Sequence, residues 1–164
     1  MGFPAFQLTA VGRALTPYTQ QDGTPIQANQ GSQREARIEI YPAYLEALED
    51  LEGFERIWLL SYLDRTTGVK LKVVPYRDTT ERGLFSTRAP CRPNPIGLSL
   101  VRLLAVDLKR GFLEVCGIDL LNETPILDIK PYIPPFECYP NSRAGWFEHA
   151  LETECADDRF AYDR

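Results

Sequence analysis

Residues 83–99 read GLFSTRAPCRPNPIGLS and constrain the fold more than any other stretch. Each of the prolines at positions 90, 93 and 95 fixes φ near about −65° and lacks an N–H for a sheet. The residues before them are pushed toward extended backbone. We therefore predict a stiff, non-helical loop that presents Arg88 and Arg92 as preorganised groups for carboxylate or phosphate. The alternative is a surface loop whose arginines pair with nearby acids.

The chain length of 164 residues fits one domain over residues 1–164, with an acidic tail from about 152 to 164 at the periphery. No apolar run approaches the roughly 18 residues that cross a bilayer, so we expect no membrane partner. The four cysteines are scattered, with one histidine, His149. This pattern predicts free thiols, no metal site and a cytoplasmic location.

The charge is distributed unevenly along the chain. The net charge is −5, yet residues 65–110 carry ten basic and three acidic side chains, and the segments on either side are acidic. This concentration predicts an anion-binding face beside the proline-rich loop. The alternative is that these charges pair in three dimensions.

Short alternating apolar segments dominate the rest of the chain and predict a mainly β fold: a small β-barrel or folded antiparallel sheet with a few short helices and long loops. Pro42 opens a short helix, Pro134 and Pro135 end regular structure, and a long polar loop spans 17–32. Neither a Rossmann nor a P-loop nucleotide motif occurs. The predicted strands cover residues 3–13, 36–40, 57–63, 69–74, 98–106, 112–118 and 126–133, and a short helix covers 144–151.

Residues 119–132, DLLNETPILDIKPY, form the second informative stretch. Asp128, Lys130 and Tyr132 alternate, so on a strand they share one face. An acid, a base and a phenol on one face can form a hydrogen-bonded set that positions an amine or hydroxyl acceptor. The alternative is an Asp128–Lys130 ion pair with Tyr132 capping the core. Cys91 and His149 are expected to have packing or surface roles.

The segments GLFSTRAPCRPNPIGLSLVRL, DLLNETPILDIKPYIP and LEGFERIWLL resemble the TrmO (YaeB, TsaA-like) family over about residues 12–146. This resemblance implies a small β-barrel that uses S-adenosylmethionine to methylate a tRNA. The acceptor would be N6 of threonylcarbamoyl-adenosine beside the anticodon of a threonine tRNA. It also implies a homodimer with the cofactor near the subunit interface.

By position, the resemblance also assigns residues to the site. Arg88 would take the methionine carboxylate of the cofactor, while Arg92, Asn94 and Lys130 are left for the acceptor. We hypothesise that Asp128 or Tyr132 accepts the N6 proton. The full set of implied cofactor contacts is Pro25, Ile26, Gln27, Asp64, Arg65, Arg88, Leu98, Asn122, Glu123, Thr124 and Pro125.

The chain departs from the family pattern at three places. Ile26 stands where the family has arginine, Asp64 where it has histidine, and Asn122-Glu123 where it has Asp-Gly. Glu123 replaces a glycine that adopts positive φ easily, and adds a charge near the ligand. Two alternatives therefore stay open: a module that binds S-adenosylmethionine without methyl transfer, and a methyltransferase with another acceptor.

Overall fold

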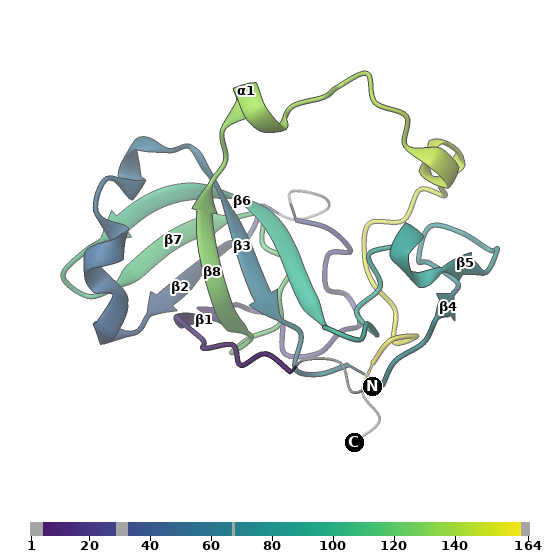
Figure 1. The fold of residues 1–164 in the computed structure, drawn as a ribbon, viewed down its shortest axis with the longest axis horizontal. Helices are drawn as coiled ribbons and strands as arrows, with labels where there is room; N and C mark the ends of the chain where they lie inside the picture. The colour runs from purple at the N-terminus through teal and green to yellow at the C-terminus, as the bar shows by residue number, and fades with distance from the viewer. Residues whose placement is uncertain (1–4, 29–32, 67, 162–164) are drawn as a thin grey trace.

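A computed structural model describes residues 5–28, 33–66 and 68–161. Six antiparallel strands close into a barrel in the order β1-β2-β7-β6-β3-β8 (Figure 1). This architecture confirms the predicted small β-barrel. The strands are β1 (Gly12–Leu15), β2 (Glu35–Ile40), β3 (Arg56–Tyr62), β6 (Ile96–Asp107), β7 (Phe112–Cys116) and β8 (Pro125–Pro131).

Strand β3 shows how the sequence builds the barrel. Ile57, Leu59 and Ser61 point inward and are fully buried, because alternate residues of a strand face opposite sides. The other face holds Trp58, Leu60 and Tyr62 and is only partly covered, although β3 pairs with β6 on one side and β8 on the other. The predicted strand is therefore confirmed, and its outer face is less buried than its apolar sequence indicates.

A smaller unit packs beside the barrel. Strands β4 (Lys72–Val73) and β5 (Arg82–Gly83) pair, and the 3-10 helix η3 (Leu84–Ser86) follows. The predicted strand at 69–74 shrinks to two residues, since Val69 and Leu71 are exposed. A second apolar cluster lies here, formed by Val73, Leu84, Ala89, Cys91 and Phe160.

The C-terminal segment contributes to this second unit. Phe160 is only 4% exposed, and Cys155 forms a β-bridge with Pro25. The expectation of a peripheral tail is therefore corrected for these residues, because an apolar side chain anchors them; residues 162–164 lie outside the described part.

The helices are short, as expected. The predicted helix at Pro42 is two 3-10 helices, η1 (Pro42–Leu48) and η2 (Leu51–Gly53). Pro134 and Pro135 begin α1 (Pro134–Glu137) instead of ending regular structure, since proline fits the first helical turn. From α1 the chain arches to η4 (Gly145–His149), which lies near β5 (Figure 1). Helices long and apolar enough to span a bilayer do not occur in the described residues.

Strand starts differ from the predictions at two more places. The structure begins β1 at Gly12, and Phe6 and Leu8 before it are exposed, so the strand predicted from residue 3 was too long; residue 3 itself lies outside the described part. Strand β6 starts at Ile96, inside the proline-rich stretch, because Pro95 is the last proline and leaves the next residues free to pair.

Candidate functional site

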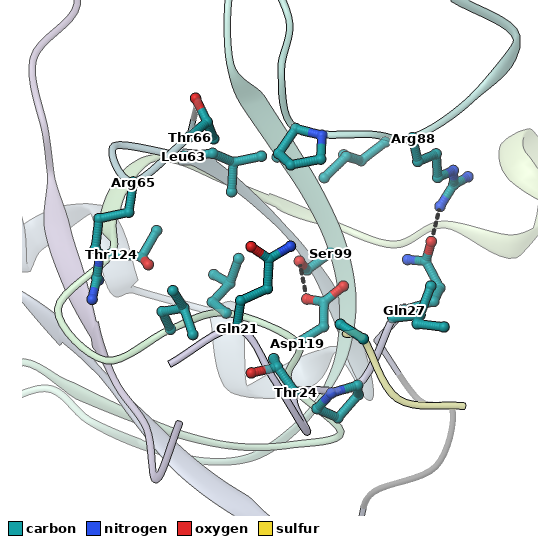
Figure 2. A pocket seen from close by; sticks show the side chains of 18 of the residues that line it. Gln21, Thr24, Gln27, Leu63, Arg65, Thr66, Arg88, Ser99, Asp119 and Thr124 are labelled. Atoms are coloured by element: carbon teal, nitrogen blue, oxygen red, sulfur yellow. Dashed lines mark hydrogen bonds between the residues drawn. The ribbon is translucent and has the colours of Figure 1, made fainter. Parts of the chain in front are cut away.

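A cavity of about 340 Å³ lies between the barrel and the smaller unit (Figure 2). Its size falls within the roughly 300–1,000 Å³ typical of small-molecule sites. Four segments distant in sequence form most of its wall: residues 21–27, 63–66, 87–99 and 119–124. The predicted loop at 17–32 thus contributes directly to the cavity, although residues 29–32 lie outside the described part.

Arg88 and Gln27 form one wall. The Arg88 Nη1 donates a hydrogen bond of 2.8 Å to Gln27 Oε1 at an exposed position (Figure 2). Arg92 also lines the cavity, but its Nη1 donates to the backbone oxygens of Thr87 at 3.0 Å and Ala89 at 3.3 Å. Arg92 therefore braces its own loop, whereas Arg88 spans two segments.

Arg65 and Thr124 form the facing wall (Figure 2). The Arg65 guanidinium donates to the backbone oxygen of Asn122 and lies 3.5 Å from the Asp64 carboxylate. This links the loop after β3 to the turn before β8. Arg88 and Thr124 thus line one cavity, as the sequence interpretation required.

Asp119 lies between these walls and was not among the predicted site residues. Its carboxylate accepts hydrogen bonds from Ser99 Oγ at 2.5 Å and from the Ala28 N–H at 2.9 Å. Burial raises the pKa of Asp119 to about 6, and the Ser99 and Ala28 hydrogen bonds oppose that rise. Asp119 opens the DLLN segment that the sequence analysis singled out, but without the fold nothing indicates that it faces Ser99.

Several predicted residues lie outside the cavity wall. Lys130 Nζ forms an ion pair of 2.8 Å with Asp128, and the Tyr132 ring meets Trp58 edge-on with centroids 6.1 Å apart. The structure therefore shows the ion-pair alternative on the outer face of β8, and it gives no support to Asp128 or Tyr132 as proton acceptor for this chain's own cavity. Predicted residues that do not line the cavity are Asn94, Asn122, Glu123, Pro125, Asp128, Lys130 and Tyr132.

The remaining predicted residues are brought together. Eight of the implied cofactor contacts line the cavity, and Arg92 joins them. The eight are Pro25, Ile26, Gln27, Asp64, Arg65, Arg88, Leu98 and Thr124.

A family profile described as the tRNA-methyltransferase O N-terminal domain matches residues 13–138, which are most of the chain and all of the barrel strands except Gly12. The chain belongs to the TrmO family. A probable S-adenosyl-L-methionine-binding protein of Pyrococcus abyssi is 41% identical over 92% of this chain and 82% of that protein. The tRNA (adenine(37)-N6)-methyltransferase of Escherichia coli K12 is 32% identical over 93% of this chain and 68% of that protein.

Solved TrmO structures share the fold. A crystal structure of TrmO from P. aeruginosa superimposes with a TM-score of 0.73 at 32% identity. The match covers 88% of this chain and 63% of that chain, so this chain spans less than two thirds of the solved TrmO chain.

The glycine that the TrmO pattern has at position 123 accounts for the backbone conformation of Glu123. Its φ is +66°, in the left-handed region that glycine adopts easily. The Glu123 carboxylate lies 3.1 Å from Arg13 Nη1, outside the cavity wall. The Glu123 carboxylate therefore does not add the expected charge to the cavity. The expected need for a positive φ at this position is confirmed.

At Gly97 in the RPNPIGLS motif, a larger residue would cause a steric clash. A Cβ built there would lie 2.3 Å from Ser61 Oγ and 3.0 Å from Leu63 Cδ2. Only glycine lets β6 approach β3 this closely beside the cavity.

Proposed function

We propose that this chain is an S-adenosylmethionine-dependent methyltransferase that modifies N6 of threonylcarbamoyl-adenosine beside the anticodon of a threonine tRNA. One observation carries the proposal: the proline-rich loop and the turn before β8, the two motif-bearing segments, supply Arg88 and Thr124 to one cavity. The names of the Escherichia coli and Pyrococcus abyssi relatives support the reaction and the cofactor respectively.

The chemistry of the cavity fits this cofactor. Arg88 offers a guanidinium to the methionine carboxylate, and Asp119 offers a carboxylate to hydroxyl or ammonium donors. Backbone near Leu98 and Thr124 is left for the adenine. When bound, the cofactor supplies a methyl group already activated by a sulfonium, so the protein's task is mainly to position the acceptor.

The acceptor's charge suits the basic segment at 65–110. A threonyl carboxylate and the tRNA phosphates are both anionic, and Arg92 lies at the cavity beside Arg88. A cytoplasmic location follows from a tRNA substrate.

We further propose that the protein is a homodimer. Tyr62, Ile96 and Leu98 are exposed by 42%, 42% and 46% on neighbouring positions of β3 and β6. Ile96 and Leu98 also line the cavity, so a second copy seated there would help enclose it. Asp128 of β8 pairs with Leu60 of β3, two residues before Tyr62, and Asp128 or Tyr132 would then serve as proton acceptor for the partner's cavity.

The dimer has a direct test. Tyr62→Glu should convert the dimer to a monomer in sedimentation velocity runs, because it buries a charge in an apolar interface. Leu108→Glu is the matched control, since Leu108 is 43% exposed and lies outside the patch. A monomeric wild-type protein would overturn the dimer proposal.

Nucleoside mass spectrometry tests the substrate. Threonine tRNA from cells that lack this protein should lose the N6-methyl group on threonylcarbamoyl-adenosine and regain it on complementation. Retention of the methylated nucleoside would rule out this acceptor. If that nucleoside is retained while the purified protein still binds S-adenosylmethionine, a binding module or another acceptor is favoured.

A further inference from the structure

A second cavity, of about 570 Å³, lies beside the first on the other side of Arg88. It is lined by aromatic rings from four parts of the chain: Tyr76, Phe85 of η3, Trp146 and Phe147 of η4, and Phe160. Phe85 is 80% exposed and Phe147 is 44% exposed. Exposed rings around a hollow form a surface on which a flat aromatic ligand can stack.

The rings are held in place by specific contacts. Trp146 Nε1 donates a hydrogen bond of 2.8 Å to the backbone oxygen of Ser86, which fixes η4 against η3. Trp146 and Phe147 meet at a 71° angle with centroids 5.8 Å apart. These contacts preorganise the aromatic surface for a ligand. Its two parts, η3 and η4, lie about sixty residues apart in the sequence.

Arginines surround these rings. The guanidinium carbons of Arg92, Arg77 and Arg82 lie 5.6, 5.7 and 5.7 Å from the ring centroids of Phe85, Phe147 and Trp146 respectively. Rings interleaved with guanidinium groups are typical of sites for single-stranded nucleic acid, where bases stack and phosphates pair with arginine. A peptide partner is less favoured, because it would not need a cation beside each exposed ring.

The two cavities share a wall. Ile26, Gln27, Tyr76, Thr87 and Arg88 line both, and the hydrogen bond from Arg88 to Gln27 lies in this shared wall. Methyl transfer needs the acceptor nitrogen within about 3–3.5 Å of the methyl group. A base stacked in the second cavity would face the cofactor across this partition, and release of the exposed Arg88–Gln27 bond would join the two spaces.

We propose that the second cavity binds the acceptor as an unstacked purine, with its base on Phe85 and Trp146 and a phosphate near Arg77, which lines the cavity. This inference rests on the proposed function, because it places the acceptor of that reaction. It also assigns a role to Phe85, Trp146 and Phe147, which were not predicted as site residues.

The test uses Trp146 as a reporter. The chain has two tryptophans, so Trp58→Phe leaves Trp146 as the sole emitter. In that background, an anticodon stem-loop RNA that carries threonylcarbamoyl-adenosine should quench Trp146 fluorescence on titration. Phe85→Ala should weaken RNA binding about tenfold or more, as loss of one stacking ring does, and leave S-adenosylmethionine affinity unchanged.

Phe6→Ala is the matched control, because Phe6 is 83% exposed and belongs to neither cavity wall; it should leave the titration unchanged. Absence of quenching, or equal RNA affinity for Phe85→Ala and Phe6→Ala, would overturn the acceptor site even if methyl transfer occurs. Quenching that Phe85→Ala weakens, without methyl transfer, would support the site and contradict the proposed reaction. The experiment therefore distinguishes failure of the acceptor site from failure of the proposed methyl transfer.

Discussion

Arg88 reaches across the cavity edge and donates a hydrogen bond of 2.8 Å to Gln27, 61 residues earlier in the chain. This contact joins the proline-braced loop to residues 21–27, which form part of the wall of the first cavity. It also forms the partition between that cavity and the aromatic one. Arg88 therefore connects the two proposed binding sites.

Replacing Arg88 should weaken the cofactor site selectively. We expect Arg88→Ala to reduce S-adenosylmethionine affinity by about 10- to 100-fold in isothermal titration calorimetry, since a charge-assisted hydrogen bond contributes ~1.5–3 kcal/mol. Arg110→Ala is the control, because its side chain is 80% exposed and lies outside the cavity. Equal affinity for the two variants would remove Arg88 from the cofactor site.

Asp119 should make the folded state sensitive to pH. Its pKa is raised to about 6 by burial, so between about pH 4 and 6 the folded state holds a proton that the unfolded state has lost. Stability contributed by this group is therefore highest below pH 4 and falls by up to about 3 kcal/mol as pH rises to 6. Urea unfolding of wild type and Asp119→Asn at several pH values checks this, and a difference that does not change with pH would contradict it.

Glu123 carries a backbone conformation that suits glycine. Because its φ is +66°, Glu123→Gly should raise the free energy of unfolding by up to about 1 kcal/mol. The lost ion pair with Arg13 is exposed and contributes little. Glu123→Ala removes the same carboxylate without relieving the backbone, so it should not stabilise. Thermal unfolding that gives both variants the same midpoint would contradict this explanation.

Gly97 should not tolerate a side chain. We expect Gly97→Ala to destabilise by about 1–3 kcal/mol, because its Cβ would collide with Ser61 Oγ. The Ser61 hydroxyl is buried and has no hydrogen-bond partner among the residues that the structure describes, so Ser61→Ala alone should be nearly neutral. The double variant should recover part of the loss in chemical denaturation, and a strictly additive loss would contradict the proposed clash.

Local chemistry in the sequence predicted much of the fold. Alternation predicted β2 and strands that overlap β6 and β7, while the family motifs predicted that Arg88 and Thr124 share a site. Alternation also placed Asp128 and Lys130 on one face, but it could not say whether that face meets the cavity. That depends on how the barrel closes.

Other site residues depend on long-range packing that one sequence does not reveal. Asp119 lies in the loop after β7, and it matters because Ser99 of β6 hydrogen-bonds to it. Trp146 matters because the chain after α1 arches back onto η3. The buried position of Phe160 likewise depends on a cluster assembled from residues 73–91.

Methyl transfer by the purified chain tests the central claim most directly. The protein is incubated with methyl-labelled S-adenosylmethionine and threonine tRNA that carries threonylcarbamoyl-adenosine, and the digested nucleosides are analysed by mass spectrometry. We predict label on N6 of that nucleoside, reduced by Arg88→Ala and unaffected by Arg110→Ala. Cofactor binding with no label in the tRNA would contradict the account.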